Sequence, residues 1–248
     1  GFENKMCYAG DLSSTFPVSK KFTSEQKEIY QLTLDAHQAS IDALGLGIPF
    51  KNAHLADCAT IFDGLKAMGL TKGNTDDAIE AGAHALFFPC GTGHMMGLDV
   101  HDMEGLDETL VGYGTEFERS TQFGTAYLRA ARTLEPGFVL TVEPGCYFIP
   151  QLIDKWRTEG TNAEFLDFDR LDSYKGFGGV RIEDDVLVTT AGDGFIRSDH
   201  RYGDFVLEWS CRPRKPEGWD SGIYFRCEPP AEGKPWPKRY QINLKQGD

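Results

Sequence analysis

The stretch of residues 91–102 carries two histidines, His94 and His101, with glycines before and between them. Gly93 and Gly97 weaken any helix there, so we expect a loop that presents imidazole side chains. A neutral imidazole can bind a metal ion, and it also exchanges protons near neutral pH. Two hydrogen-bonded surface histidines are the alternative, and the loop by itself does not decide between the two interpretations.

Three further segments, residues 8–17, 136–145 and 178–185, each contain a carboxylate and at least one glycine. The carboxylates in question are Asp11, Glu143 and Glu183. The alternative to a functional role is a turn or cap residue for Asp11 and a solvated strand acid for Glu183. Glu143 differs, because it follows an apolar run directly and precedes a proline, so its charge would be half buried and would need a partner.

These four segments occur in the order and approximate spacing of the pita-bread metallopeptidases, a family that includes prolidases and aminopeptidase P. The chain resembles this family from residue 1 to about residue 190. The resemblance implies an α+β fold and metal-dependent hydrolysis of Xaa-Pro peptide bonds, with short Xaa-Pro peptides as partners. It also implies a manganese centre, although other divalent metals suit oxygen-rich ligands.

The resemblance assigns a role to each candidate residue. The implied metal ligands are Asp11, His94, Glu143 and Glu183. The implied catalytic residues are His101, which would hydrogen-bond the substrate, Glu143, which would also carry a proton, and Arg181, which would orient a carboxylate. The implied substrate-binding residues are His84, Cys90 and Arg129, the last of which would hold the free carboxylate of a dipeptide.

Several of these residues have plainer explanations. Arg181 and Glu183 stand two apart on an expected strand, so they would share a face, where an ordinary salt bridge is the alternative. Arg129 could be a solvated helix arginine, and His84 could be a histidine at a helix end.

Two positions depart from the family pattern. Cys90 stands where family members usually carry histidine, which replaces a hydrogen-bonding group by a weak donor. The family's first metal-binding aspartate belongs to an Asp-x-Gly-x-Glu pattern, and Gly1 to Glu3 match only its end. We therefore expect a chain that begins inside the pita-bread domain and holds one ion where the complete family site holds two.

Composition narrows the class of protein. The 248 residues are 40% hydrophobic with no apolar run long enough for a bilayer, so we expect no membrane partner. The net charge of -13 argues against nucleic acid. Six scattered cysteines favour reduced thiols and a cytoplasmic location, and nothing in the sequence opposes a homodimer.

The elements that must position the site alternate between helix and strand. Residues 23–44 and 54–68 show helical spacing of apolar side chains, and Thr23 with Gln26 has the spacing of a capping box. Residues 86–88, 138–142 and 180–188 are predicted strands.

Composition changes near residue 191. The chain after Gly192 has ten Lys and Arg and nine Asp and Glu, so the acidic excess of the protein lies before this point, and three of the four Trp lie after it. We therefore predict two domains, an incomplete pita-bread domain at 1–191 and a short antiparallel β segment of a partial jelly roll at 192–248. The tail, with expected strands at residues 205–210, 223–226 and 240–244, resembles part of the 3-keto-disaccharide hydrolases. A peptide-binding module without catalysis, or a sugar-binding protein acting through the tail, are the alternative functions.

Overall fold

The computed structural model describes residues 2–3, 7–189, 220–225 and 240–245. The chain divides into two compact units, Gly1–Thr189 and Thr190–Asp248. The first unit contains every candidate site residue.

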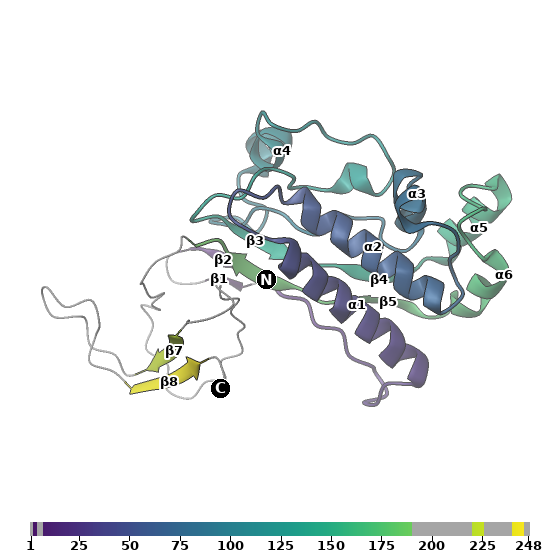
Figure 1. Cartoon of the computed structure of the whole chain (residues 1–248), viewed down its shortest axis with the longest axis horizontal. Coiled ribbons are helices and arrows are strands. Elements are labelled where there is room, and N and C mark those ends of the chain that lie inside the picture. The colour runs from purple at the N-terminus through teal and green to yellow at the C-terminus, as the bar shows by residue number, and fades with distance from the viewer. Residues whose placement is uncertain (1, 4–6, 190–219, 226–239, 246–248) are drawn as a thin grey trace, which may run out of the picture. The chain divides into compact units, whose positions relative to one another are not determined.

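Two long helices, α1 (Ser24–Ala43) and α2 (Lys51–Ala67), pack side by side (Figure 1). At the start of α1 the Thr23 side chain accepts a hydrogen bond from the Gln26 amide, and the Gln26 side chain accepts one from the Thr23 amide. This capping box confirms the sequence prediction for that helix. Helix α2 begins three residues earlier than the predicted start at His54.

The site lies on a ribbon of short antiparallel strands. Strand β3 (Val139–Val142) pairs with β6 (Asp184–Leu187), and β4 (Gly145–Phe148) pairs with β5 (Gly178–Arg181). The two pairs follow one another along the chain, interrupted at residues 143–144 on one side and 182–183 on the other. Pro144 has no N–H to donate to a ladder, which explains a break at this point. Helix α1 contacts β3, β4 and β5.

The predicted strand at residues 138–142 is confirmed, and the one at 180–188 is divided in two by the break. The prediction of a strand at residues 86–88 is wrong, because Leu86 ends the 3-10 helix η1 (Ala83–Leu86). Phe87 and Phe88 both donate their amides to the His84 carbonyl. A short apolar run buried on all sides does not reveal from its pattern whether it is strand or helix.

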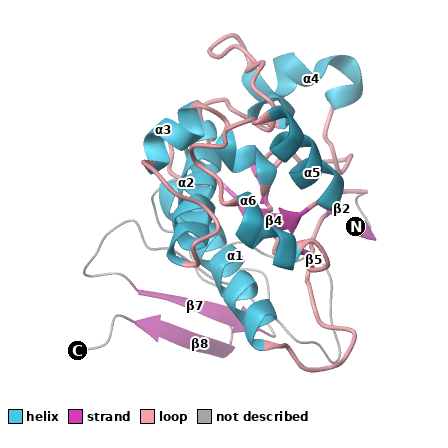
Figure 2. Cartoon of the chain, turned by 90° about the vertical axis from the view of Figure 1, so that its right-hand side faces the viewer, coloured by secondary structure: helices cyan, strands magenta, loops and turns pink. Residues whose placement is uncertain are grey.

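Shorter helices surround this framework. They are α3 (Thr75–Glu80), α4 (Glu104–Tyr113), η2 (Thr125–Tyr127), α5 (Pro150–Glu159), α6 (Phe168–Leu171) and η3 (Asp172–Tyr174). Figure 2 looks onto the end of the unit formed by α5 and α6, with β4 and β5 behind them. Near the chain start, β1 (Phe2–Glu3) pairs antiparallel with β2 (Ala9–Gly10).

The largest core cluster joins the buried faces of α1 and α2 to the ribbon and to the segment after η1. Phe87 and Phe148 meet edge to face, with 5.8 Å between ring centroids. A second cluster packs Phe50 and Ala53 against Leu140 and Val142 of β3. The strand that leads to Glu143 is therefore held on one face by buried apolar side chains, while Thr141 on the other face points toward the site. Among the described residues, no helix combines the length and apolar character needed to cross a bilayer.

In the second unit, β7 (Asp220–Phe225) and β8 (Tyr240–Lys245) pair antiparallel, with Ile223 opposite Ile242. These strands overlap the tail strands predicted at residues 223–226 and 240–244, and β7 begins three residues before the predicted start. The third, at residues 205–210, lies outside the described residues.

Candidate metal centre

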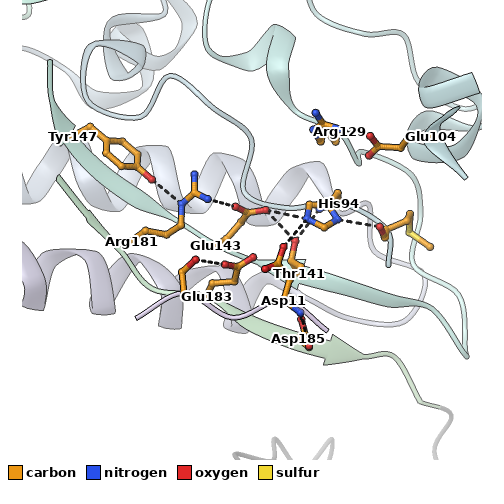
Figure 3. Close-up of polar contacts among 12 residues, drawn as sticks. Asp11, His94, Glu104, Arg129, Thr141, Glu143, Tyr147, Arg181, Glu183 and Asp185 are labelled. Carbon is orange, nitrogen blue, oxygen red and sulfur yellow. Dashed lines mark hydrogen bonds and ion pairs between the residues drawn. The ribbon is translucent and has the colours of Figure 1, made fainter. Parts of the chain in front are cut away.

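Four segments far apart in the sequence meet at the break in the ribbon (Figure 3). Glu143 stands between β3 and β4, and Glu183 stands between β5 and β6. Asp11 directly follows β2, and His94 comes from the loop at residues 91–102. The loop conformation predicted for this stretch is confirmed: Met95 forms an isolated bridge with Leu140, and the loop contains no helix.

His94 is oriented by its backbone surroundings. Its Nδ1 lies 3.0 Å from the Met95 carbonyl oxygen, and its amide donates to Thr141 Oγ1 at 3.1 Å. A carbonyl oxygen only accepts, so Nδ1 carries the proton and Nε2 presents a lone pair. That nitrogen lies 3.4 Å from Glu143 Oε1 and 3.8 Å from Asp11 Oδ2. Burial lowers the pKa of His94, which keeps the ring neutral and available as a ligand.

Glu143 is nearly buried and has three polar neighbours. Arg181 Nη1 donates to its Oε2 at 2.9 Å, and Thr141 Oγ1 donates to its Oε1 at 3.2 Å. Burial, with the nearby Glu183 charge, raises the pKa of Glu143 to about 7 against the pull of Arg181. The predicted need of this half-buried charge for a partner is therefore met by Arg181.

Glu183 and Asp11 are placed by the chain start. The Ser13 hydroxyl donates to Glu183 Oε2, and the Glu183 amide donates to the Ser13 carbonyl at 3.2 Å. Glu183 is 4% exposed, and its Oε1 is buried without a hydrogen-bond partner. The Asp11 amide donates to Asp185 Oδ2 at 3.2 Å, so Asp185 fixes the backbone of a predicted ligand.

The donor set fits a divalent cation. Asp11, His94 and Glu183 each offer a ligand atom, and these atoms lie within 4.8 Å of one another. Three carboxylates lie near the imidazole lone pair, and of these three Arg181 forms an ion pair with Glu143. Carboxylate oxygens with a single imidazole suit manganese, magnesium or zinc. A bound ion would supply the partner that Glu183 Oε1 lacks.

A pocket of about 750 Å³ opens beside His94, Glu143 and Arg181. His101, Cys90 and Arg129 also line it, together with the aromatic rings of Phe123 and Tyr127. His101 packs edge to face on His94, with 4.3 Å between ring centroids. Cys90 faces Arg181 and Tyr147, and burial raises the pKa of its thiol. Five of the six predicted catalytic and substrate-binding residues, all except His84, therefore line one cavity together with the predicted metal ligand His94.

Two arginines of the pocket are already paired with acids. Arg129 forms an ion pair with Glu104 of α4, whose side chain is 10% exposed. Arg119 contacts Glu108 of the same helix at 2.6 Å. A substrate carboxylate would therefore compete with Glu104 for the Arg129 guanidinium.

Two sequence expectations need correction. Arg181 pairs with Glu143, not with Glu183, because β5 ends at Arg181 and the break turns residue 183 toward Ser13. His84 lies in η1, is 1% exposed and is not among the residues that line the described pocket. It belongs instead to a separate buried group with His54 and Cys58.

Several supporting residues were not found from the sequence. Thr141 could have been predicted from its spacing, because it stands two residues before Glu143 on a strand and so shares its face. Tyr147, whose hydroxyl accepts from Arg181 Nε at 2.8 Å, had no such signal, and neither did Ser13 or Glu104. Their contacts join segments that sequence spacing does not relate.

The break in the ribbon, its carboxylates and the single imidazole define the pita-bread class of fold. Residues 1–190 match the family described as "Metallopeptidase family M24", and the chain belongs to that family. Residues 151–248 also match a family described as "3-keto-alpha-glucoside-1,2-lyase-like domain", in agreement with the resemblance of the tail.

Relatives and solved structures agree with this placement. The chain is 40% identical over 186 residues to the Xaa-Pro dipeptidase of Homo sapiens, covering 75% of this chain and 36% of that protein. It is 37% identical to a probable Xaa-Pro aminopeptidase of Verticillium alfalfae, covering 75% and 38%. The structure of Pseudomonas aeruginosa aminopeptidase PepP matches with a TM-score of 0.53 and 37% identity, covering 74% of this chain and 34% of that one. The chain thus spans about a third of the length of the relatives that it matches.

Proposed function

We propose that this chain carries the metal centre of a peptidase that hydrolyses Xaa-Pro peptide bonds, with Mn²⁺ as the working metal. The observation that carries the proposal is the lone pair of His94 Nε2, which faces Glu143 and Asp11 beside the unpartnered oxygen of Glu183. Relatives named as Xaa-Pro dipeptidases and aminopeptidases support the choice of substrate.

A divalent ion bound to this set would lower the pKa of a water molecule and polarise a substrate carbonyl. The residues of the chain would supply the proton transfers and the positioning. Glu143, whose carboxylate lies beside His94 and Arg181, would take a proton from that water molecule and return it to the leaving amine. Arg181, fixed by Tyr147, holds the other carboxylate oxygen of Glu143 in place.

His101 and Arg129 would position the substrate from the pocket side. His101 stands against His94 in the same cavity, where its N–H can donate to the carbonyl oxygen as negative charge develops on it. Arg129 would bind the carboxylate of a C-terminal proline, which favours dipeptides as substrates.

The direct test is an assay of the 248-residue chain with Mn²⁺ on Ala-Pro, beside a His94→Ala variant. Release of proline by the parent chain and its loss in the variant support the proposal. Binding of Ala-Pro without release would instead identify a peptide-binding module. If the chain neither binds nor cleaves Ala-Pro, but binds or cleaves a keto-disaccharide also in the His94→Ala variant, the function lies in the tail.

A further inference from the structure

A second group of metal-binding side chains is buried between α2 and η1. His54, Cys58 and His84 are at most 1% exposed, and each offers one ligand atom, all within 4.8 Å of one another. His54 and Cys58 stand four apart on α2, so they share one face of the helix. None of the three lines the described pocket.

The spacing of the two α2 side chains fits a tetrahedral ion. Cys58 Sγ lies 3.6 Å from His54 Nε2. An ion about 2.3 Å from sulfur and about 2.0 to 2.1 Å from nitrogen would hold these atoms about 3.6 Å apart. A thiol hydrogen-bonded to imidazole has the same separation. The choice between a metal ion and a hydrogen bond therefore depends on the partners of His54 and on His84.

The hydrogen bonds around His54 prepare Nε2 as a ligand. Its Nδ1 lies 3.0 Å from Thr92 Oγ1, whose hydroxyl donates to Asp57 Oδ2 at 2.5 Å. Because the Thr92 hydroxyl donates its one proton to Asp57, the Thr92 oxygen can only accept from Nδ1–H of His54. Nε2 then carries the lone pair, and a chain that ends in a carboxylate is the usual outer support of a metal-bound histidine.

His84 has a buried ring nitrogen without a hydrogen-bond partner, which also points to a bound ion. Its Nδ1 is buried without a hydrogen-bond partner, while Nε2 has only a long contact of 3.5 Å with Thr125 Oγ1. A buried and unpartnered ring nitrogen is rare unless something binds it.

We propose that His54, Cys58 and His84 form a second metal site, for zinc or another thiolate-preferring transition metal, separate from the oxygen-rich centre at His94. Two nitrogens and one sulfur leave one tetrahedral position for a water molecule. Binding exchanges the thiol proton of Cys58 for the metal ion and releases that proton to solvent. Because Thr92 belongs to the loop that presents His94, the metal would also tie that loop to α2.

Cobalt distinguishes the two sites, because the centre at His94 contains no sulfur. The 248-residue chain is stripped with a chelator under reducing conditions and titrated with Co²⁺. We expect a near-ultraviolet band from thiolate-to-cobalt charge transfer whose final intensity corresponds to one thiolate-bound Co²⁺ per chain, because Co²⁺ bound at His94 does not add to the band. Cys58→Ser should abolish the band. Its absence from the parent chain, or its persistence in the variant, would overturn the proposal.

Other thiols serve as matched controls. Cys146→Ser changes an equally buried cysteine of the core and should keep the band. Cys90→Ser, and Cys211→Ser with Cys227→Ser, should keep it as well. Loss of the band in any of these, with Cys58→Ser unaffected, assigns the sulfur elsewhere and refutes the site.

Should Cys58→Ser lose its fold by circular dichroism, X-ray absorption of the zinc-loaded parent chain decides the question. The expected spectrum shows one sulfur at about 2.3 Å with nitrogen at about 2.0 Å. A shell of oxygen and nitrogen alone contradicts the proposal.

Discussion

The two histidines of the loop at residues 91–102 touch each other but have different surroundings. His94 is 2% exposed and has its free nitrogen toward carboxylates, whereas His101 is exposed and faces the pocket. The contact of Nδ1 with the Met95 carbonyl fixes the tautomer of the His94 ring, while the His94 amide is anchored on the Thr141 hydroxyl. The same residue type thus has two different environments, which suit the two roles that we propose for these histidines.

We expect His94→Ala to weaken Mn²⁺ binding by more than the ~10- to 100-fold typical of outer residues, because a ligand is lost. His101→Ala should leave the affinity unchanged. Calorimetric titration of both variants with Mn²⁺ measures the difference. Equal losses would show that the loop binds metal through both rings.

Arg129 offers a prediction about substrate. A charge-assisted hydrogen bond is worth about 1.5 to 3 kcal/mol, or roughly ten- to a hundredfold in discrimination. In a chain active on peptides, Arg129→Ala should remove most of the preference for Ala-Pro over its amide and over an Ala-Pro-extended peptide. Glu104→Gln should increase that preference, because the competing carboxylate is gone.

Arg119→Ala is the matched control for this measurement, since Arg119 lines the same pocket and pairs with another acid of α4. It should keep the preference. If Arg119→Ala abolishes the preference and Arg129→Ala does not, our assignment is wrong and Arg119 holds the substrate carboxylate.

At the scale of elements, the site depends on how closely the histidine loop approaches β3. A Cβ atom built on Gly93 would lie 2.0 Å from the Thr141 carbonyl oxygen, and that backbone cannot yield without moving the strand before Glu143. His94 then donates its amide to the Thr141 side chain on the same strand. The glycine is therefore required by close packing of loop against strand.

Gly93→Ala should destabilise the chain by about 1 to 3 kcal/mol through overpacking and weaken Mn²⁺ binding with it. Gly105→Ala is the control, because a Cβ there meets nothing within 4 Å. Thermal unfolding and Mn²⁺ titration of both variants compare the two sites. A Gly93→Ala variant as stable as the control would mean that the loop has room to move.

Sequence patterns predicted those elements whose signals are local. The capping box of α1 and the apolar spacing of α1 and α2 follow from neighbouring residues, and so does the strand that leads to Glu143. The partner of Arg181 could not be predicted, because it depends on a break in the ribbon and on cross-strand register. The group at His54 was missed for the same reason: only tertiary folding brings His84 to α2.

At the scale of the whole first unit, the metal centre is assembled by antiparallel pairing of distant segments. Ser13 bridges to Glu183, Asp185 holds the Asp11 amide, and Met95 bridges to Leu140. Each predicted ligand is thus fixed through a neighbour on another segment. Metal binding and folding of this unit should therefore support each other.

This arrangement predicts the effect of extending the chain. In the register of β1 and β2, Phe2 lies opposite Gly10 and Glu3 opposite Ala9. If that register continues, a residue placed two positions before Gly1 lies opposite Ser13, on the face that carries Asp11. An aspartate there would add a carboxylate beside Asp11 and Glu183, and two ions need more ligands than the four predicted here.

The 248-residue chain should therefore retain about one Mn²⁺ after dialysis, and the chain preceded by Asp-Ala should retain about two. The group at His54, Cys58 and His84 should not add to this count, because Mn²⁺ prefers oxygen ligands to thiolate. Elemental analysis counts the ions, and an Asn-Ala extension controls for added length, since its amide brings no charge. Two ions in the unextended chain would mean that another residue takes the place of the added aspartate. A single ion in the Asp-Ala chain would mean that β1 does not continue in register, and the site would then work with one metal.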